Sequence, residues 1–325
     1  MKIFKKIKYL FWSVLMMALL LPVRASAAGS IDLNRDVRLT ISYQDGKTPL
    51  ADTTFYLYLV AEVDAYGELT PVDTFRQYPV DIRGKNDDAW RALASTLEGY
   101  VLRDQIIPTD SQKTDEKGML TFPSPQKKLK PGLYLVIGQR HTEGKLIYDA
   151  APFMVLLPGL DEEANDWVYD VTASVKFDSE PVPDTVTRKA LKVWKDEGHE
   201  KERPKEITVQ LLKDGKVYKT AVLNEENNWR ITWDQLDGSC KWTVTEKNPT
   251  NYTVTVTQEG ITFVVTNSYG KPGSTTPGTS TTDKTPSGKL PQTGQLWWPV
   301  PVLLSVGLLL LVIGLIRRRG DRNEA

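Results

Sequence analysis

The chain has 325 residues, 40% of them hydrophobic, and its 41 lysines and arginines balance its 41 aspartates and glutamates. Because much of the basic excess lies at the two ends, the part between them is mildly acidic, which argues against a nucleic-acid partner. A single cysteine, Cys240, excludes an intrachain disulfide. Two histidines, His141 and His199, offer little material for a transition-metal site or a histidine-dependent nucleophile, so no cofactor, no metal and no enzyme are expected.

Residues 1–27 are predicted to be a signal peptide. Lysines at positions 2, 5, 6 and 8 form a basic region, and residues 9–21 are apolar. Ala25-Ser26-Ala27 is a small-x-small cleavage site, so we expect the mature chain to begin at Ala28. The alternative is a retained anchor, but the apolar stretch is short for a membrane span.

Residues 28–180 are predicted to form a first domain rich in strands. Its hydrophobic residues alternate with polar ones over residues 37–43, the period of a half-buried strand, and Asp45-Gly46 follows as a turn. We expect further strands at residues 53–60, 133–138, 153–157 and 168–175. Residues 104–125 are predicted to be mostly loop.

One helix is predicted to interrupt these strands, at residues 87–99. Trp90, Leu93, Ala94 and Leu97 fall on one helical face, and Gly99 is interpreted as the residue that stops the helix.

Pro181-Val182-Pro183-Asp184 is a stiff boundary, after which residues 187–269 form a second domain. Asp214-Gly215 reads as a hairpin turn within it. Seven short strands are expected, at residues 190–194, 207–212, 221–223, 229–233, 241–246, 252–256 and 262–267. So many strands in so short a segment predict a β-sandwich.

Residues 270–289 contain mainly Gly, Ser, Thr and Pro and too few apolar residues to fold, which predicts a disordered stalk. Residues 290–325 then combine three features. Leu290-Pro291-Gln292-Thr293-Gly294 precedes an uncharged run, residues 297–316, and three arginines, residues 317–319. The run is long enough for a transmembrane helix, and the arginines should hold its end in the cytoplasm.

This arrangement resembles the LPXTG cell-wall sorting signal of Gram-positive surface proteins. The resemblance implies that a sortase cuts between Thr293 and Gly294 and passes the Thr293 carboxyl to peptidoglycan or to another pilin subunit. It also implies an exported, wall-anchored protein. The alternative is an ordinary single-span anchor with a chance pentapeptide.

The second domain carries a more specific pattern. It comprises residues 192–196 (Lys-Val-Trp-Lys-Asp), 203–212, Asn227-Asn228-Trp229, 242–246 and 265–269. These segments resemble a collagen-adhesin B-type (Cna-B) domain, an immunoglobulin-like sandwich in which many members form an intramolecular Lys–Asn isopeptide bond. The resemblance implies that Lys192 is the nucleophile, Asn267 the acceptor and Glu246 the proton-shuttling catalyst. The alternative is an uncrosslinked sandwich.

The residue types suit that chemistry. A lysine amine attacks only when it is neutral, and burial lowers a lysine pKa while it raises a carboxyl pKa. A protonated Glu246 can polarise the Asn267 amide and carry protons to the departing ammonia. An apolar shell is required, and five aromatic residues are candidates for it: Trp194, Trp229, Trp242, Phe263 and Tyr269.

The first domain resembles the N-terminal domains of Gram-positive pilins through residues 117–122, 129–136, 151–158 and 167–172. In polymerising backbone pilins a lysine follows within a Tyr-Pro-Lys-Asn motif. Here the stretch is Ser174-Val175-Lys176-Phe177, so Lys176 is a candidate for the intersubunit linkage whose neighbours depart from the motif. The alternative is a solvated strand-end lysine. The departure favours a minor or wall-anchoring subunit over the shaft.

The predicted fold class is therefore all-β, with two tandem immunoglobulin-like sandwiches, the first with a helical insertion. The leading functional hypothesis is a structural, wall-anchored pilus subunit. The alternative is a surface adhesin whose N-terminal domain binds a host or matrix ligand. A secreted enzyme is the least favoured class, because no nucleophile or metal motif is present.

Overall fold

The computed structural model describes residues 29–83, 86–161, 163–247 and 251–270. The predicted signal peptide, stalk, sorting motif and membrane span lie outside these residues. Within the described ranges no helix combines the length and apolar composition needed to cross a membrane.

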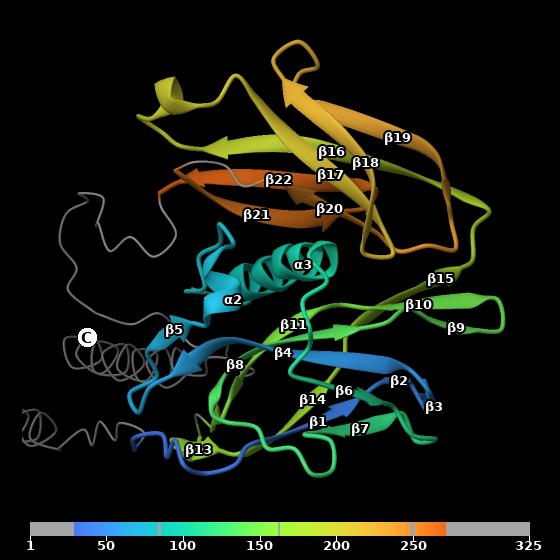
Figure 1. Ribbon diagram of the computed structural model, residues 1–325. Coiled ribbons are helices and arrows are strands. Elements are labelled where there is room, and N and C mark those ends of the chain that lie inside the picture. Colours follow the sequence, from blue (N-terminus) through green and yellow to red (C-terminus); the bar gives the residue numbers. More distant parts are fainter. Residues whose placement is uncertain (1–28, 84–85, 162, 248–250, 271–325) are drawn as a thin grey trace, which may run out of the picture.

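The first domain is built from small sheets stacked beneath a helix (Figure 1). One sheet has the order β11-β8-β4-β5, with β6 also paired to β4, and a second has the order β14-β1-β7. The strands of these two sheets are β1 (Arg38–Ser42), β4 (Thr54–Val63), β5 (Leu69–Pro71), β6 (Asp110–Lys113), β7 (Met119–Phe122), β8 (Gly132–Gly138), β11 (Phe153–Leu157) and β14 (Asp170–Ser174). Shorter pairings are made by β2 (Gln44–Asp45), β3 (Thr48–Pro49), β9 (His141–Glu143), β10 (Leu146–Ala150), β12 (Gly159–Asp161), β13 (Asp166–Val168) and β15 (Phe177–Pro181).

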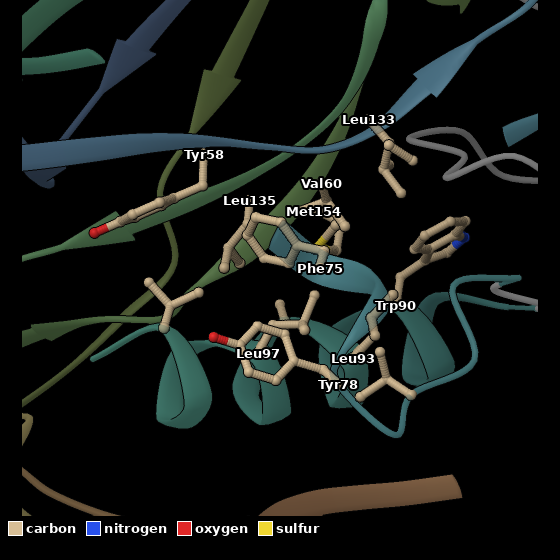
Figure 2. Packing of buried hydrophobic residues seen from close by; sticks show 14 of the residues in the cluster. Tyr58, Val60, Phe75, Tyr78, Trp90, Leu93, Leu97, Leu133, Leu135 and Met154 are labelled. Atoms are coloured by element: carbon tan, nitrogen blue, oxygen red, sulfur yellow. The ribbon is translucent and has the colours of Figure 1, made fainter. Parts of the chain in front are cut away.

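Strand β4 is buried on both faces because it separates two hydrophobic clusters. Phe55 and Leu57 point into the core between the sheets. Tyr58 and Val60 belong to the second cluster, which the helices cover. Figure 2 shows this second cluster, in which strand residues such as Leu135 face Tyr78 and the helix residues Trp90, Leu93 and Leu97.

Helix α3 (Asp87–Arg103) begins as the sequence predicts. The side chain of its N-cap, Asn86, accepts a hydrogen bond from the Ala89 amide at 2.9 Å. Trp90, Leu93, Ala94 and Leu97 are buried, as expected of the apolar face.

The prediction that Gly99 stops this helix is wrong, because the helix continues to Arg103. Gly99 instead lies where α3 approaches the second domain closely. A Cβ at this position would lie 2.8 Å from Thr245 Cγ2.

Residues 104–125 are mostly loop, as predicted, but the prediction missed the two short strands β6 and β7 within them. Strand β6 has the polar sequence DSQK, so it carries no hydrophobic alternation that could reveal it. A short second helix, α2 (Asp73–Arg76), was likewise not predicted.

The second domain is a two-sheet sandwich, with orders β19-β16-β22-β21 and β18-β17-β20. Its strands are β16 (Thr185–Lys195), β17 (Glu206–Lys213), β18 (Lys216–Asn224), β19 (Arg230–Asp237), β20 (Trp242–Glu246), β21 (Tyr252–Glu259) and β22 (Thr262–Tyr269), with a 3₁₀ turn, η1, at Glu200–Glu202. Each predicted strand has a counterpart here, and most run longer than predicted. Asp214 and Gly215 make the predicted turn with φ of 48° and 80°. The all-β fold class is confirmed.

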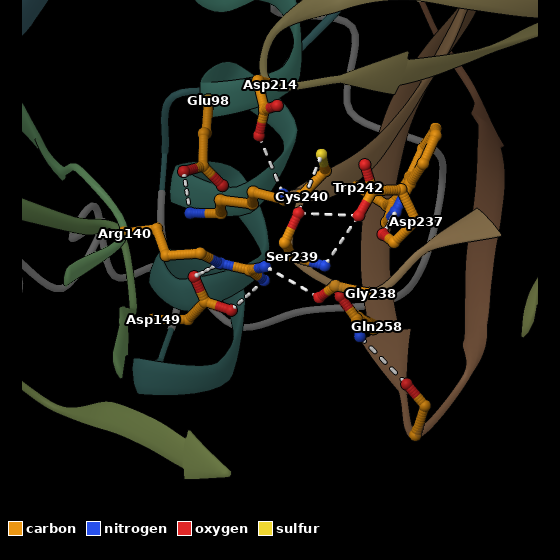
Figure 3. Close-up of polar contacts among 12 residues, drawn as sticks. Glu98, Arg140, Asp149, Asp214, Asp237, Gly238, Ser239, Cys240, Trp242 and Gln258 are labelled. Atoms are coloured by element: carbon orange, nitrogen blue, oxygen red, sulfur yellow. Dashed lines mark hydrogen bonds and ion pairs between the residues drawn. The ribbon is translucent and has the colours of Figure 1, made fainter. Parts of the chain in front are cut away.

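The two domains are in direct contact through α3. Lys241 Nζ donates to Glu98 Oε1 at 2.6 Å, and the Arg140 guanidinium, paired with Asp149, reaches the Gly238 carbonyl oxygen at 3.4 Å. Figure 3 shows Glu98 and Arg140 of the first domain facing the turn that holds Gly238. The interface is therefore polar at its border and close-packed along the helix.

The Lys241–Glu98 pair should contribute to stability because it is largely buried, with side-chain exposures of 20% and 6%. We expect Lys241→Ala to lower the free energy of unfolding of residues 28–270 by about 2–4 kcal/mol, since it leaves the Glu98 carboxylate without its partner. Urea denaturation measures this change.

Lys213→Ala is the matched control, because it breaks an ion pair that is exposed to solvent. The side chains of Lys213 and its partner Asp237 are 38% and 45% exposed. It should cost under about 1 kcal/mol. Equal effects of the two substitutions would contradict a structural role for the interface pair.

Candidate functional site

The structure brings Lys192, Glu246 and Asn267 together in the core of the second domain. Lys192 Nζ lies 3.6 Å from Glu246 Oε2, and Asn267 Nδ2 donates to Glu246 Oε1 at 2.9 Å. The three residues are 4%, 0% and 0% exposed. The cluster thus contains an amine, a carboxyl and a primary amide, shielded from water.

Strand register explains this convergence. Strands β16 and β22 run parallel, with Lys192 opposite Val265, so Asn267, two residues further on, faces the same side of the sheet. Glu246 comes from β20 in the opposing sheet, where it shares the inward face with Val244. The first and last strands of the domain therefore lie side by side, and β20, which lies between them in the sequence, supplies the carboxyl from the opposite sheet.

Burial favours the neutral forms of both ionisable groups. Desolvation lowers the pKa of Lys192 to about 8, against the opposing pull of Glu246. Desolvation likewise raises the pKa of Glu246, although Lys192 and Asn267 act in the other direction. A neutral amine beside a protonated carboxyl is the state that nucleophilic attack on an amide needs.

Two oxygen atoms of the cluster lack hydrogen-bond partners within the part of the chain that the structure describes. They are Glu246 Oε2 and Asn267 Oδ1. An ionised carboxylate accepts but cannot donate, whereas a proton on Glu246 adds one donor to a buried site that has an unpaired amide oxygen. The hydrogen-bond inventory therefore suits a protonated Glu246.

Aromatic rings form the wall on one side of the amine. Lys192 Nζ lies 4.3 Å from the centre of the Trp194 ring. Trp194 packs edge-on against Trp229 and against Tyr252. Trp242, another residue expected in this shell, instead packs against Tyr218, and its indole nitrogen donates to the Asp237 carbonyl.

Sequence reasoning missed a polar group behind this wall. Asp196 is buried, accepts two hydrogen bonds from Arg203 at 2.7 and 2.6 Å, and accepts a third from the Tyr252 hydroxyl at 3.2 Å. Arg203 is the largest cause of the lowered pKa of Asp196. No periodicity marks these residues, because the loop between β16 and β17 brings them together.

The structure does not bring the other candidate residues into this cluster. Lys176 is exposed between β14 and β15 of the first domain, and its main-chain oxygen accepts from the Ala151 amide. Leu290, Pro291, Gln292, Thr293 and Gly294 lie outside the described residues, so the sorting motif stays a prediction.

The lowered pKa of Lys192 predicts a pH dependence when no bond can form, as in Asn267→Ala. Between the folded value of about 8 and the ordinary lysine value, the unfolded chain binds more protons than the folded one, so stability should rise with pH. We expect a gain of about 1.5 kcal/mol in the free energy of unfolding between pH 8 and 9.5.

Lys192→Met combined with Asn267→Ala is the reference, because it removes the titrating amine and keeps the other groups. Urea midpoints of the two proteins should diverge over this interval. Parallel pH profiles would show that burial does not perturb Lys192.

Comparison with known proteins finds a family match for each of two segments of the chain. Residues 40–173 match the N-terminal D1 domain family of Gram-positive pilin subunits, and residues 188–268 match the Cna protein B-type domain family. A collagen adhesin of Staphylococcus aureus is 34% identical over 140 residues, which is 40% of this chain and 12% of that protein. The chain therefore spans only a small part of that relative.

Three solved structures are among those similar to this chain. They are a single B repeat of the S. aureus collagen-binding surface protein (19% identity, 73% of this chain and 98% of that one, TM-score 0.26), the major pilin SpaD of Corynebacterium diphtheriae (16%, 73% and 65%, 0.31) and the basal pilin SpaE of Lactobacillus rhamnosus GG (10%, 70% and 85%, 0.29). The two family matches lie on the two domains described above. The chain is therefore similar to a Gram-positive pilin D1 domain over residues 40–173 and to a Cna B-type domain over residues 188–268.

Proposed function

We propose that this chain is a cell-wall-anchored structural subunit, a minor or anchoring pilin, whose second domain is stiffened by a Lys192–Asn267 isopeptide bond. The buried contact of Lys192, Glu246 and Asn267 carries the proposal. No other arrangement of the described residues offers an amine, a carboxyl and an amide in one water-free cluster. The bond forms once in each molecule, so no enzymatic turnover is proposed.

The reaction needs only these three side chains. The neutral Lys192 Nζ attacks the Asn267 Cγ, and the bond between Cγ and Nδ2 breaks. One proton leaves Nζ and reaches Nδ2 through the Glu246 carboxyl, so Nδ2 departs as ammonia. Glu246 Oε1 already holds Nδ2 at 2.9 Å, which places the catalyst beside the leaving group.

The position of the bond gives it a mechanical role. It would join β16 and β22, which are the first and last strands of the domain in the sequence but neighbours in the sheet. Treated like a disulfide that closes a loop of roughly 75 residues, it would stabilise the fold by about 4–5 kcal/mol. Tension applied to the chain would pass from β16 directly to β22 and would not pull out the strands between them.

The order of motif, apolar run and arginines in residues 290–319 supports covalent attachment at the cell surface. In this proposal a sortase links the Thr293 carboxyl to peptidoglycan or to another subunit. Lys176, exposed on the first domain, is the proposed acceptor for a further subunit. Its unusual sequence neighbours favour a minor or anchoring position.

A surface adhesin is the second candidate. The relative that is 34% identical carries the name collagen adhesin, although the match spans only 12% of it. In that case the first domain would bind a matrix or host ligand, and the second would act as a spacer. Saturable binding of residues 28–270 to immobilised collagen would favour this function.

Intact-mass measurement tests the internal bond. Residues 28–270 should be lighter than their sequence mass by one ammonia, because Nδ2 of Asn267 is lost. Lys192→Ala, Glu246→Ala and Asn267→Ala should each have the full mass. Lys189→Ala, on the same strand but exposed, is the control and should lose ammonia like the parent. A parent at full mass would rule out the bond.

Cell fractionation tests the two external linkages. Thr293→Ala should move the protein from the wall fraction to the membrane or the medium. Lys176→Ala should remove high-molecular-weight species that contain this subunit while the protein stays wall-bound. Exposed Lys130 supplies the control substitution. Persistence of those species in Lys176→Ala would exclude Lys176 as the acceptor.

A further inference from the structure

The second domain has an open side that the first domain closes. Among the described strands, β20 pairs only with β17, and β21 pairs only with β22, so each is the edge of its sheet. Helix α3 lies along both of these edges (Figure 1). An edge strand carries unpaired backbone groups that must meet water or another partner.

The first domain supplies those partners. On β21 the Val256 amide donates to Thr96 Oγ1 at 2.8 Å, and the Val254 amide donates to the Pro79 carbonyl at 2.6 Å. On β20 the Glu246 carbonyl accepts from the Tyr100 hydroxyl at 3.1 Å. The backbone of both edge strands of the second domain is thus hydrogen-bonded to the first domain.

Packing is as close as the hydrogen bonding. All five residues of β20 are buried, including Thr243 and Thr245, which point away from the sandwich core. Gly99 permits this approach, since a Cβ would lie 2.8 Å from Thr245 Cγ2 and 3.3 Å from the Val244 carbonyl oxygen. Glycine inside a helix costs about 1 kcal/mol relative to alanine, so the contact accounts for a residue that the helix alone disfavours.

Tyr100 is held rigidly. It is fully buried, and its ring stacks on Tyr78 at a centroid distance of 5.0 Å and an interplanar angle of 8°. Its hydroxyl contacts the main chain of the residue whose side chain is the proposed catalyst. Fixing the Glu246 carbonyl fixes the backbone from which the carboxyl projects.

From these contacts we infer that α3 of the first domain completes the isopeptide site of the second, with Tyr100 as a positioning residue for Glu246 and the helix as the element that excludes water. The inference rests on the proposed function and adds a condition to it: the bond forms efficiently only when the first domain is docked.

Water exclusion matters because of the charges around Glu246. The titratable groups near Glu246 are Lys192 from β16 and Tyr100 from α3. Asn267 from β22 is neutral, and Asp196, just after β16, acts on Lys192. Water entering along β20 would stabilise the ion pair between Lys192 and Glu246 relative to the neutral pair. A protonated amine cannot attack, so hydration would lower the fraction of reactive molecules and slow the reaction.

The test uses residues 28–270 made in a cell-free system, with the fraction that has lost ammonia followed over time by intact mass. Tyr100→Phe removes only the hydroxyl and should slow bond formation about tenfold. Gly99→Ala keeps every hydrogen-bonding group but pushes α3 from β20, and it should slow the reaction as well. Thr96→Val is the matched control, because it removes an edge hydrogen bond of the same helix to β21, not to the strand of Glu246.

The pH profile separates positioning from a general loss of stability. The parent rate should follow a bell bounded by the two apparent pKa values of the coupled pair. In Tyr100→Phe, water near Lys192 and Glu246 should stabilise their ion pair relative to the doubly protonated and fully deprotonated states, which widens the bell. It should also lower the maximal rate, because fewer molecules then hold the reactive neutral pair. A merely unstable variant would lower the plateau without widening it.

The outcomes are distinguishable. A parent at full mass refutes the proposed function itself. A bonded parent with Tyr100→Phe and Gly99→Ala at the parent rate and with the parent profile refutes this inference alone. Equal slowing in Thr96→Val and Tyr100→Phe, with unchanged bell widths, also overturns it, because the helix would then act only on overall stability.

Discussion

Desolvation of a lysine and a glutamate in one core is the constraint on which the rest of the second domain depends. Neither Lys192 nor Glu246 has access to water, and burial shifts both pKa values toward the neutral forms. Two charges in this position would be costly, whereas an amine, a carboxylic acid and an amide are tolerable neighbours. The same burial that makes charges costly at this site favours the neutral amine that the proposed bond needs.

The sandwich alone does not provide that burial. Strands β20 and β21 are the edges of its two sheets, and they leave one side of the sandwich open. The helical insertion of the first domain covers it, with Gly99 and Tyr100 at the closest contacts. Neither domain alone shows this contact. In the first domain α3 is only an inserted helix, and in the second domain β20 and β21 are only unpaired edge strands.

This arrangement also bears on the proposed mechanical role. The first and last strands of the second domain are neighbours, and the Lys241–Glu98 pair and the α3 contacts hold the first domain against the same edge. A bond between β16 and β22 would stiffen the second domain, and the docked helix α3 would resist separation of the two domains. Covalent and noncovalent reinforcement would then act on the same strands.

The sequence by itself determined the order of the domains and most of the strands, because alternating hydrophobicity and Asp-Gly and Pro-rich turns are local signals. It also predicts a sorting motif, a local pattern that depends on no fold. Resemblance to a known family supplied the three site residues, which spacing alone could not select. The polar strand β6 and the role of Gly99 were misjudged, since one carries no periodicity and the other looks like a helix stop. Only the tertiary structure decided that Lys192, Glu246 and Asn267 meet without water, and that Tyr100 reaches Glu246 from 146 residues away. Such contacts arise from packing between distant segments, and no local pattern encodes them.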